Sequence, residues 1–222
     1  IYTNSIVGSV RCVIRDRSHT WSALGQTDST YGDFGITADG FWTYNLDNDK
    51  AQELAKGQII TERFVVQADD GLGGTISQTV TITITGENDE PTITNITTNN
   101  NVEEDNALAN MVTGDLGVTD VDLQDGHTWS IDGQEATSGT AASINATFGT
   151  ITLDSNGVWK YTLDDTKVDF LASYETREET FTIKVDDGNG GTDEFDLVVT
   201  IKGSNDVPVS YTHLTLPTME LV

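Results

Sequence analysis

Residues 64–85 read FVVQADDGLGGTISQTVTITIT, and residues 181–202 read FTIKVDDGNGGTDEFDLVVTIK, 117 positions later. In both stretches apolar residues alternate with polar ones on either side of an Asp-Asp-Gly-x-Gly-Gly turn, which is the pattern of half-buried strands. The glycines supply the positive φ angles that a tight antiparallel connection needs. The two stretches therefore predict antiparallel β-structure that occurs twice in the chain.

The same repetition extends outward from these stretches. FWTYNLD at 41–47 corresponds to VWKYTLD at 158–164, and GENDEP at 86–91 corresponds to GSNDVP at 203–208. In the first pair of motifs the aromatic and leucine side chains alternate, as they do in a strand. Each of these runs follows Asp-Gly or Asn-Gly, the strongest short signal for a hairpin.

A third motif shows where the two copies differ in length. HTWS occurs at 19–22 and again at 127–130, an offset of only 108, so the second copy carries nine extra residues. They fall within 131–147, which we expect to be a surface loop or an extended hairpin. A repeat this long predicts complete domains in series, each with its own core. We place the first repeat at 1–88 and the second at 89–206.

The predicted fold class is all-β, with two tandem antiparallel β-sandwiches of Greek-key type. Many short strands with turns every 8–12 residues are typical of such sandwiches. Helix is expected only as one or two turns, at Asp49–Leu54 and Thr166–Ala172. Because Trp42 and Trp159 occupy corresponding mid-strand positions, we expect both to be core residues.

The charge of the chain is strongly acidic. It has 36 Asp and Glu against 11 Lys and Arg, a formal net charge of −25. Such a surface repels nucleic acid and anionic membranes and attracts cations. No apolar run approaches the ~20 residues that span a bilayer, so we expect neither nucleic-acid binding nor membrane insertion. Two interpretations remain, a solvated acidic surface and a set of metal sites, and the Asn-Asp and Asp-x-Asp spacing favours metal sites.

Other chemistry finds little support in the sequence. Cys12 is the single cysteine, so no internal disulfide braces either domain. The Gly-rich turn is followed by a strand and not by the helix that a phosphate-binding loop requires. His19 and His127 are repeat-equivalent and no Ser-His-Asp set recurs, so we expect no enzymatic activity and no catalytic residues.

Acidic segments that lie far apart in sequence form the candidate site. Calcium takes six to eight oxygen ligands from carboxylates, amides and main-chain carbonyls. In a Greek-key sandwich the linker between the repeats, the Asp-x-Asp segment and the Gly-rich turn meet at one end. A divalent cation there would convert the mutual repulsion of the carboxylates into a clamp; the alternative is a merely solvated acidic rim. The residues expected to bind calcium are Asn88, Asp89, Glu103, Glu104, Asp120, Asp122 and Asp186.

Three motifs, in order, carry a family resemblance. They are TITITGENDEP at 81–91, GTITLDSNGVWKYTL at 149–163 and DGNGGT at 187–192. Together they resemble the VCBS repeat and the related cadherin-like modules of large bacterial surface adhesins of the RTX type. The resemblance covers residues 9–208, nearly the whole chain, and it implies that the two sandwiches are of immunoglobulin-like or cadherin-like type.

The resemblance implies further ligands. The closing motif is similar to the calcium linker of cadherins, which places Glu87 near its first carboxylate. By the same likeness, Asp47 and its repeat equivalent Asp164 correspond to the Leu-Asp-Arg-Glu region of cadherins, and Asp120 and Asp122 correspond to their Asp-x-Asp pair. Asp47 and Glu87 therefore join the expected calcium ligands.

The resemblance also implies a function. We expect a calcium-stiffened extender segment of a bacterial surface or secreted adhesin that acts in cell adhesion and biofilm formation. Such a chain would be extracellular or on the cell surface, exported by type I secretion, monomeric, and in contact with calcium and neighbouring repeats. One alternative is a calcium-dependent glycan- or cell-binding module, which an exposed aromatic pair outside the repeat-equivalent set would favour; the sequence shows none. A second alternative is an accessory module of a secreted RTX hydrolase or toxin.

Two departures from the family pattern qualify these expectations. In the first repeat, Cys12 and Ile14 stand where the second has Asp120 and Asp122, so the corresponding site lacks those oxygens. In addition, VSYTHLTLPT at 209–218 has no counterpart after the first linker. We expect residues 207–222 to be a non-native or disordered tail; the alternative is the first strand of a third repeat.

Overall fold

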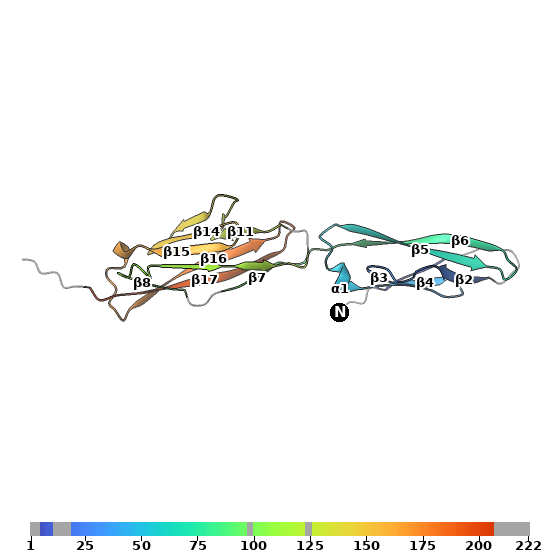
Figure 1. The fold of residues 1–222 in the computed structure, drawn as a ribbon, viewed down its shortest axis with the longest axis horizontal. Coiled ribbons are helices and arrows are strands. Elements are labelled where there is room, and N and C mark those ends of the chain that lie inside the picture. The colour runs from blue at the N-terminus through green and yellow to red at the C-terminus, as the bar shows by residue number, and fades with distance from the viewer. Residues whose placement is uncertain (1–4, 11–18, 97–99, 123–125, 207–222) are drawn as a thin grey trace, which may run out of the picture. The chain divides into compact units, whose positions relative to one another are not determined.

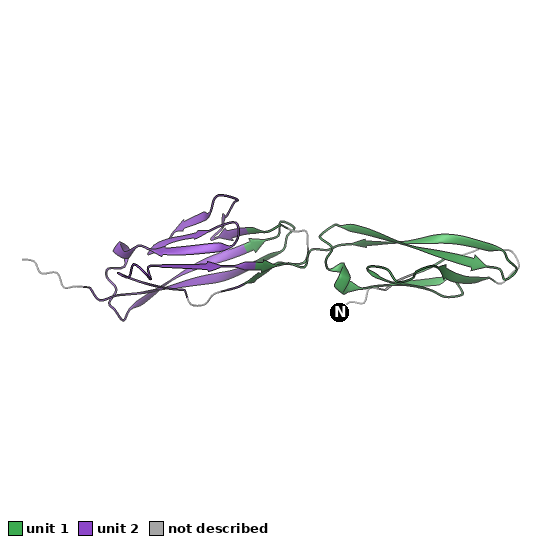
Figure 2. Ribbon diagram, in the orientation of Figure 1, with its two compact units in different colours: residues 1–94, 118–128, 185–193 green, residues 95–117, 129–184, 194–222 purple. Residues whose placement is uncertain are grey.

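The computed structural model describes residues 5–10, 19–96, 100–122 and 126–206. In these ranges the regular secondary structure is almost wholly β-strand, which confirms the all-β prediction (Figure 1). It divides into two compact units (Figure 2). Unit 1 comprises residues 1–94, 118–128 and 185–193, and unit 2 comprises 95–117, 129–184 and 194–222. No helix within the described ranges is long and apolar enough to cross a membrane.

Unit 1 contains two three-stranded sheets, with strand orders β1-β4-β3 and β2-β5-β6. All pairings within them are antiparallel. The Asp-Asp-Gly turn joins the two longest strands, which pair over 11 residues each. The elements are β1 (Ser5–Ser9), β2 (Thr20–Leu24), β3 (Gly32–Ile36), β4 (Phe41–Leu46), α1 (Asn48–Ala51), β5 (Ile59–Asp69) and β6 (Thr75–Thr85).

One apolar core lies between these two sheets. Alternate residues of β5 and β6 are buried, as the sequence predicts: Phe64, Val66, Ala68, Val80, Ile82 and Ile84. Phe34, on the opposite sheet, stacks on Phe64 with ring centroids 4.5 Å apart. Trp42 is only half-buried and packs against this core. The prediction that Trp42 is a core residue is therefore confirmed only in part. The two sheets form a β-sandwich.

Most of the second sandwich belongs to unit 2. Its sheets have the strand orders β12-β11-β16-β17-β8 and β13-β14-β15-β9. The turn between β16 and β17, with the adjoining strand ends at 185–193, is part of unit 1. The elements are β8 (Asn101–Glu103), β9 (Met111–Asp115), β11 (Thr128–Ile131), β12 (Gln134–Glu135), β13 (Ala142–Asn145), β14 (Gly149–Leu153), β15 (Val158–Leu163), the 3₁₀ turn η1 (Asp165–Lys167), β16 (Thr176–Asp186) and β17 (Thr192–Lys202).

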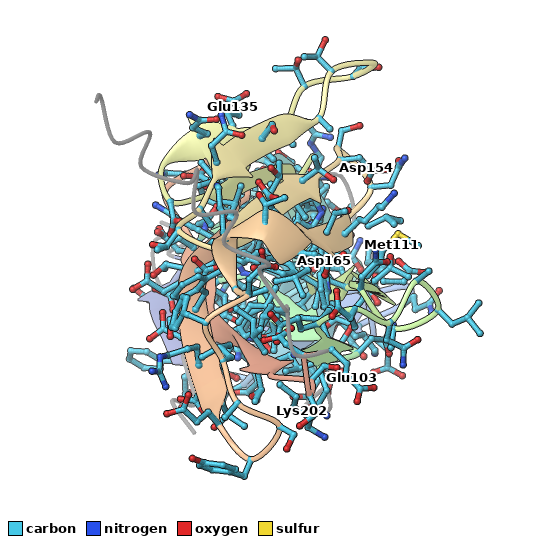
Figure 3. The ribbon with its side chains drawn as sticks, turned by 90° about the vertical axis from the view of Figure 1, so that its left-hand side faces the viewer. Glu103, Met111, Glu135, Asp154, Asp165 and Lys202 are labelled. Carbon is cyan, nitrogen blue, oxygen red and sulfur yellow. The ribbon has the colours of Figure 1, made fainter. Side chains whose placement is uncertain are left out.

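The segment 131–147, which contains the nine extra residues of the second repeat, includes the strands β12 and β13. β12 pairs with β11 across the turn at Asp132 and Gly133, whose φ angles are 46° and 78°. β13 pairs with β14, so the segment takes the hairpin form and not the loop form. The exposed Glu135 of β12 points away from the sheets (Figure 3). The expected helical turns are present but short, as α1 and η1.

A tyrosine and a glutamate join the two sheets in each repeat. The Tyr44 hydroxyl on β4 donates to Glu62 Oε2 on β5 at 2.6 Å, and Tyr161 on β15 donates to Glu179 Oε2 on β16 at 2.6 Å. The other carboxylate oxygen of each glutamate accepts a main-chain N–H, from Tyr31 in one repeat and Phe148 in the other. These bonds satisfy polar groups at the sandwich centre and fix how the sheets face each other.

The Tyr161–Glu179 pair leads to a first prediction. Tyr161→Phe is expected to cost about 1–3 kcal/mol of unfolding free energy, because the buried Glu179 carboxylate loses a charge-assisted partner. Tyr174→Phe, at an 86 % exposed position, is the control and should change stability by less than about 0.5 kcal/mol. Urea unfolding followed by circular dichroism measures both. Equal midpoints for the two variants would contradict the assigned role.

The same pair predicts a pH effect on stability. Burial, together with the hydrogen bond to Glu179 and its charge, raises the pKa of Tyr161 well above its ordinary value of 10.0. The folded chain therefore holds this proton more tightly than the unfolded chain does. The contribution of the Tyr161 hydroxyl to the unfolding free energy is complete below pH 10, and it is lost as the pH rises beyond that value toward the pKa of Tyr161 in the folded chain.

Candidate functional site

A short strand pairing brings two acidic segments together in unit 1. β7 (Thr92–Thr94) pairs with β10 (Gly117–Thr119) in a two-stranded sheet. Asn88 and Asp89 precede β7, and the Asp-x-Asp pair follows β10 directly. The Ile93 N–H donates to Asp193 Oδ2 at 2.7 Å and anchors β7 beside the start of β17. The predicted convergence of linker and Asp-x-Asp segment is therefore built into the strand pairing.

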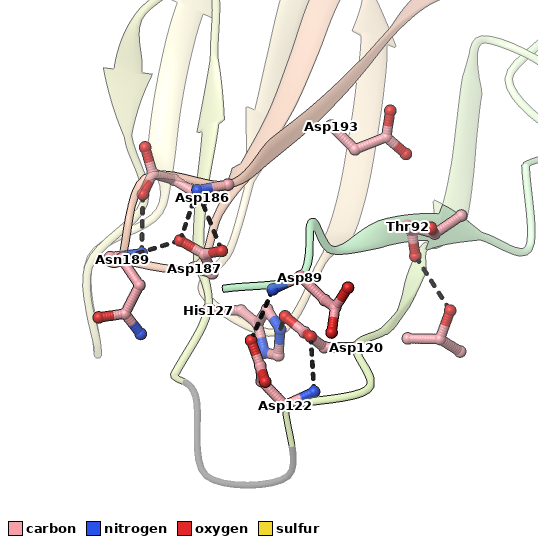
Figure 4. Close-up of polar contacts among 12 residues, drawn as sticks. Asp89, Thr92, Asp120, Asp122, His127, Asp186, Asp187, Asn189 and Asp193 are labelled. Carbon is pink, nitrogen blue, oxygen red and sulfur yellow. Dashed lines mark hydrogen bonds and ion pairs between the residues drawn. The ribbon is translucent and has the colours of Figure 1, made fainter. Parts of the chain in front are cut away.

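Hydrogen bonds connect these segments (Figure 4). The Asp89 N–H donates to Asp122 Oδ2 at 2.8 Å, and the Asp122 N–H donates to Asp120 Oδ1 at 3.0 Å. The second carboxylate oxygen of Asp120 lies 3.2 Å from Nε2 of His127. The Asp120 side chain is 3 % exposed and Asp122 is 2 % exposed. Two carboxylates are thus held close together and out of solvent.

Asp187 joins the group from the Gly-rich turn. Asn88 Nδ2 donates to Asp187 Oδ2 at 2.7 Å. Asp187 Oδ1 accepts the N–H groups of Asn189, Gly190 and Gly191 at 2.7–3.0 Å. Gly191 is required there because a Cβ at this position would lie 2.3 Å from Asp187 Oδ2. Burial acts to raise the pKa of Asp187, but these hydrogen bonds outweigh it and hold the pKa below its usual value.

The resulting Asn–Asp cluster consists of Asn88, Asp89, Asp120, Asp122 and Asp187, and within the described ranges no Lys or Arg side chain forms an ion pair with these residues. Asn88 Oδ1 and Asp122 Oδ1 are buried and have no hydrogen-bond partner among the described residues. Burial, and then the charges of Asp122 and Asp120, raise the pKa of the Asp89 carboxyl. Leaving buried oxygens unpaired costs free energy. A cation would satisfy these oxygens.

The donor set of the Asn–Asp cluster suits calcium. Four carboxylates and one amide oxygen are hard ligands of the kind that calcium binds. Within the part of the chain that the structure describes, no three His, Cys, Asp or Glu side chains already surround a common point as they do in a formed metal centre. The unpaired oxygens of Asn88 and Asp122 are therefore the feature that fits an ion.

Three other predicted ligands also belong to unit 1 but have different surroundings. Asp186 Oδ1 accepts the Gly188 N–H at 2.8 Å within the Gly-rich turn. Glu87 is exposed. Asp47 forms an ion pair with Lys50 at 3.0 Å, and the hydrogen bond and charge of Lys50 lower the pKa of Asp47.

Glu103 and Glu104 belong to unit 2. The exposed Glu103 accepts a hydrogen bond from Asn106 Nδ2 at 2.8 Å. Glu104 is 1 % exposed, and its Oε2 accepts the Ser204 N–H at 3.0 Å. Burial is the main cause that raises the pKa of Glu104, and Oε1 of this buried carboxylate has no partner in the described ranges. Glu104 is thus a second buried carboxylate with an unpaired oxygen.

Asp187 is not among the calcium ligands predicted from the sequence, which include its neighbour Asp186 instead. Phe181, Ile183 and Val185 of β16 are buried, and Asp187 continues the same alternation by one step. Following the period of two past the end of the strand would have selected Asp187. The positions of Cys12 and Ile14 and the tail at 207–222 lie outside the described residues.

Comparison with known proteins gives the family. The family described as bacterial cadherin-like domain matches residues 88–203, slightly more than half of the chain. No curated protein matches the sequence.

Solved structures of cadherin ectodomains are distantly similar. Domains EC3–6 of protocadherin gammaB7 show 16 % identity and a TM-score of 0.48, over 87 % of this chain and 42 % of that one. Domains EC22–24 of mouse cadherin-23 show 18 % identity and a TM-score of 0.47, over 88 % of this chain and 58 % of that one. The chain thus spans about half the length of these structures, and the fold rests on the strand pairing described above. With a family match that covers the linker, the Asp-x-Asp pair and the Gly-rich turn, the chain belongs to the bacterial cadherin-like domain family.

Proposed function

We propose that this chain is a calcium-stiffened extender segment of a bacterial surface or secreted adhesin of the RTX type, with a structural role in cell adhesion and biofilm formation. The observation that carries the proposal is the pair of buried, unpaired oxygens of Asn88 and Asp122 within a group of carboxylates. Family membership supports an extracellular structural module of the adhesion type. No catalytic role is proposed.

The Asn–Asp cluster would hold the ion. Asp89, Asp122 and Asp187 would supply carboxylate oxygens, and Asn88 would supply the amide oxygen that now lacks a partner. Asp120, which lies against His127, would add a further negative charge that attracts the ion. Asp47, Glu87 and Asp186 are proposed as further ligands on the strength of the family resemblance. Glu103 and Glu104 are proposed to serve a separate ion, since Glu104 Oε1 is buried and unpaired.

Calcium supplies charge neutralisation at the linker between the repeats. Without it, like charges repel the linker from the Asp-x-Asp segment and from the Gly-rich turn. With it, three segments distant in sequence are tied to one point, and the linker becomes rigid. The net charge of −25 keeps repeats soluble and separate, in keeping with a monomer. A stiff chain of repeats would hold a binding domain away from the cell; export by type I secretion is part of this proposal.

Calcium is therefore expected to stabilise the protein. For an extracellular module the dissociation constant should be about 10⁻⁴–10⁻³ M. Calcium at 100 times that constant should add about 2.7 kcal/mol to the unfolding free energy of the structure that binds it. Thermal unfolding by calorimetry in a calcium series, reversed with EGTA, measures the gain.

Magnesium provides the matched control. It requires near-ideal octahedral geometry and gives up water reluctantly, so equal concentrations should stabilise less. The concentration of each ion rises to about 10 mM, which is about ten times the upper limit of the dissociation constant expected for calcium. An unfolding temperature that does not change over this calcium range, or that changes equally with both ions, would remove the support for a calcium site.

A further inference from the structure

The outer edge of β6 is open in unit 1. β6 is the last strand of its sheet, whose order is β2-β5-β6, and among the described residues only β5 pairs with it. The strand is 11 residues long, Thr75–Thr85. An edge strand of this length presents a row of main-chain N–H and C=O groups with which another strand can pair.

The sequence of β6 carries none of the features that usually protect an exposed edge. TISQTVTITIT contains no charged residue, no proline and no glycine, although the whole chain has a net charge of −25. All of its residues except Ser77 and Gln78 are threonine, isoleucine or valine, which favour strands. The equivalent strand β17 reads TDEFDLVVTIK and has three acidic residues and a lysine. Because proteins place charges or prolines on edges that have to stay unpaired, β6 has the sequence of a strand that becomes covered.

In the second repeat the corresponding edge is occupied. β8 pairs with β17 in parallel, with Val102 opposite Ile201. The N–H of Thr200, which is the repeat equivalent of Thr83, donates to the Asn100 main-chain oxygen at 2.9 Å. Val102 is 1 % exposed, so β8 adds an apolar side chain to the core as well as main-chain hydrogen bonds. The second repeat therefore supplies the direction and the side-chain pattern of a strand that fits β6.

The core side chains of β6 are less fully covered than those of β17. Three of them keep an exposed fraction of 3–7 %, whereas their three equivalents on β17 keep 0–1 %. The residues are Val80, Ile82 and Ile84 in β6, and Leu197, Val199 and Ile201 in β17. The difference has the same sign at all three positions, as expected if one repeat has a covering strand and the other does not.

We infer that β6 accepts a β8-type strand from another repeat of this kind. A β8-type strand is an extended segment with an apolar residue at the position of Val102, between polar residues, and it pairs with β6 in parallel. Strand addition of this type takes its affinity from main-chain hydrogen bonds and its specificity from alternate side chains. A second copy that pairs through its own β6 fits less well, because it brings together two chains of net charge −25. The inference rests on strand pairing and not on calcium at the Asn–Asp cluster.

Fluorescence anisotropy tests the inference, with a labelled synthetic peptide of residues 92–105 and the whole chain at up to about 1 mM. The titration is done in EGTA, so that no calcium bridges the acidic partners, and in about 0.15 M salt, which screens their repulsion. The peptide should bind. The same peptide with Val102→Asp should bind at least about tenfold more weakly, because it would bring a carboxylate to the core. This comparison changes only the peptide, so unfolding of the chain cannot explain it.

Two variants of β6 locate the binding edge. Thr83→Pro removes the N–H that corresponds to the one that Thr200 donates to β8, and proline is tolerated where the N–H of an edge strand faces solvent. This variant should weaken peptide binding at least about tenfold. Thr83→Ala keeps the N–H, so it is the matched control and should bind as the parent does. Circular dichroism and the unfolding temperature show whether both variants fold.

Three results would overturn the inference: no binding of the parent peptide up to about 1 mM, equal binding of the two peptides, or equal binding by folded Thr83→Pro and Thr83→Ala. Light scattering on the chain without peptide should show a monomer. A dimer that Thr83→Pro dissociates would mean that a second copy occupies β6, and this result would also overturn the inference.

Discussion

Replacing Trp159 with alanine is expected to lower the unfolding free energy of the second repeat by about 3–5 kcal/mol. Trp159 is 0 % exposed and is the second residue of β15. Its ring covers Gly114 on the paired strand β9, where a Cβ would come within 2.5 Å of the indole. Nothing larger than glycine fits beneath the ring, so its removal leaves a cavity between two fixed strands.

Trp42→Ala is the internal control, because Trp42 is the repeat equivalent of Trp159 but is only half-buried. It should cost about 1–3 kcal/mol. Urea unfolding with circular dichroism compares the two variants. A larger loss for Trp42→Ala than for Trp159→Ala would contradict the assignment of Trp159 to the centre of the core.

Asp187→Asn is expected to weaken calcium binding at least about tenfold, or about 1.4 kcal/mol. The change removes one carboxylate charge from the Asn–Asp cluster, and the site's calcium affinity depends on its ligand charges. Asp70→Asn is the matched control. Asp70 Oδ1 accepts the N–H groups of Leu72 and Gly74 in the equivalent turn of the first repeat, so the two variants disturb similar local hydrogen bonds.

The two variants should differ because their surroundings differ in sequence. The second repeat supplies Asp120 and Asp122, and the first supplies Cys12 and Ile14 at the same positions. Isothermal titration with calcium should therefore show a loss of affinity for Asp187→Asn and none for Asp70→Asn. Equal losses in both variants would mean that the turns, and not the cluster, bind the ion.

Much of the fold was predictable because the same pattern of strands and turns occurs in both repeats. The alternation of residues 64–85 and 181–202 fixed both strands and the turn between them, and β5 with β6 and β16 with β17 follow that pattern. The burial of Trp42 was not predictable in the same way. Its alternation matches that of Trp159, but burial depends on how far the opposite sheet covers each ring, and no local pattern records that.

The candidate site was predictable in part. Asn88, Asp89, Asp120 and Asp122 come together because they flank two strands that pair. Glu104 could not be placed from sequence, since its contact with Ser204 spans 100 positions and arises from the parallel pairing of β8 with β17. The Tyr–Glu pairs were also not predicted. A glutamate in an alternating strand is expected to face solvent, and the sequence does not show that a tyrosine of the opposite sheet binds it.

Small-angle X-ray scattering, with calcium and then with EGTA, tests the central claim most directly. Calcium at the linker should give a profile that fits one rigid arrangement of the two repeats. EGTA should give a broad distribution of distances between them, while circular dichroism shows that the strands persist. The double variant Asp120→Ala and Asp122→Ala should behave in calcium as the parent does in EGTA. Identical scattering in both conditions would contradict the account.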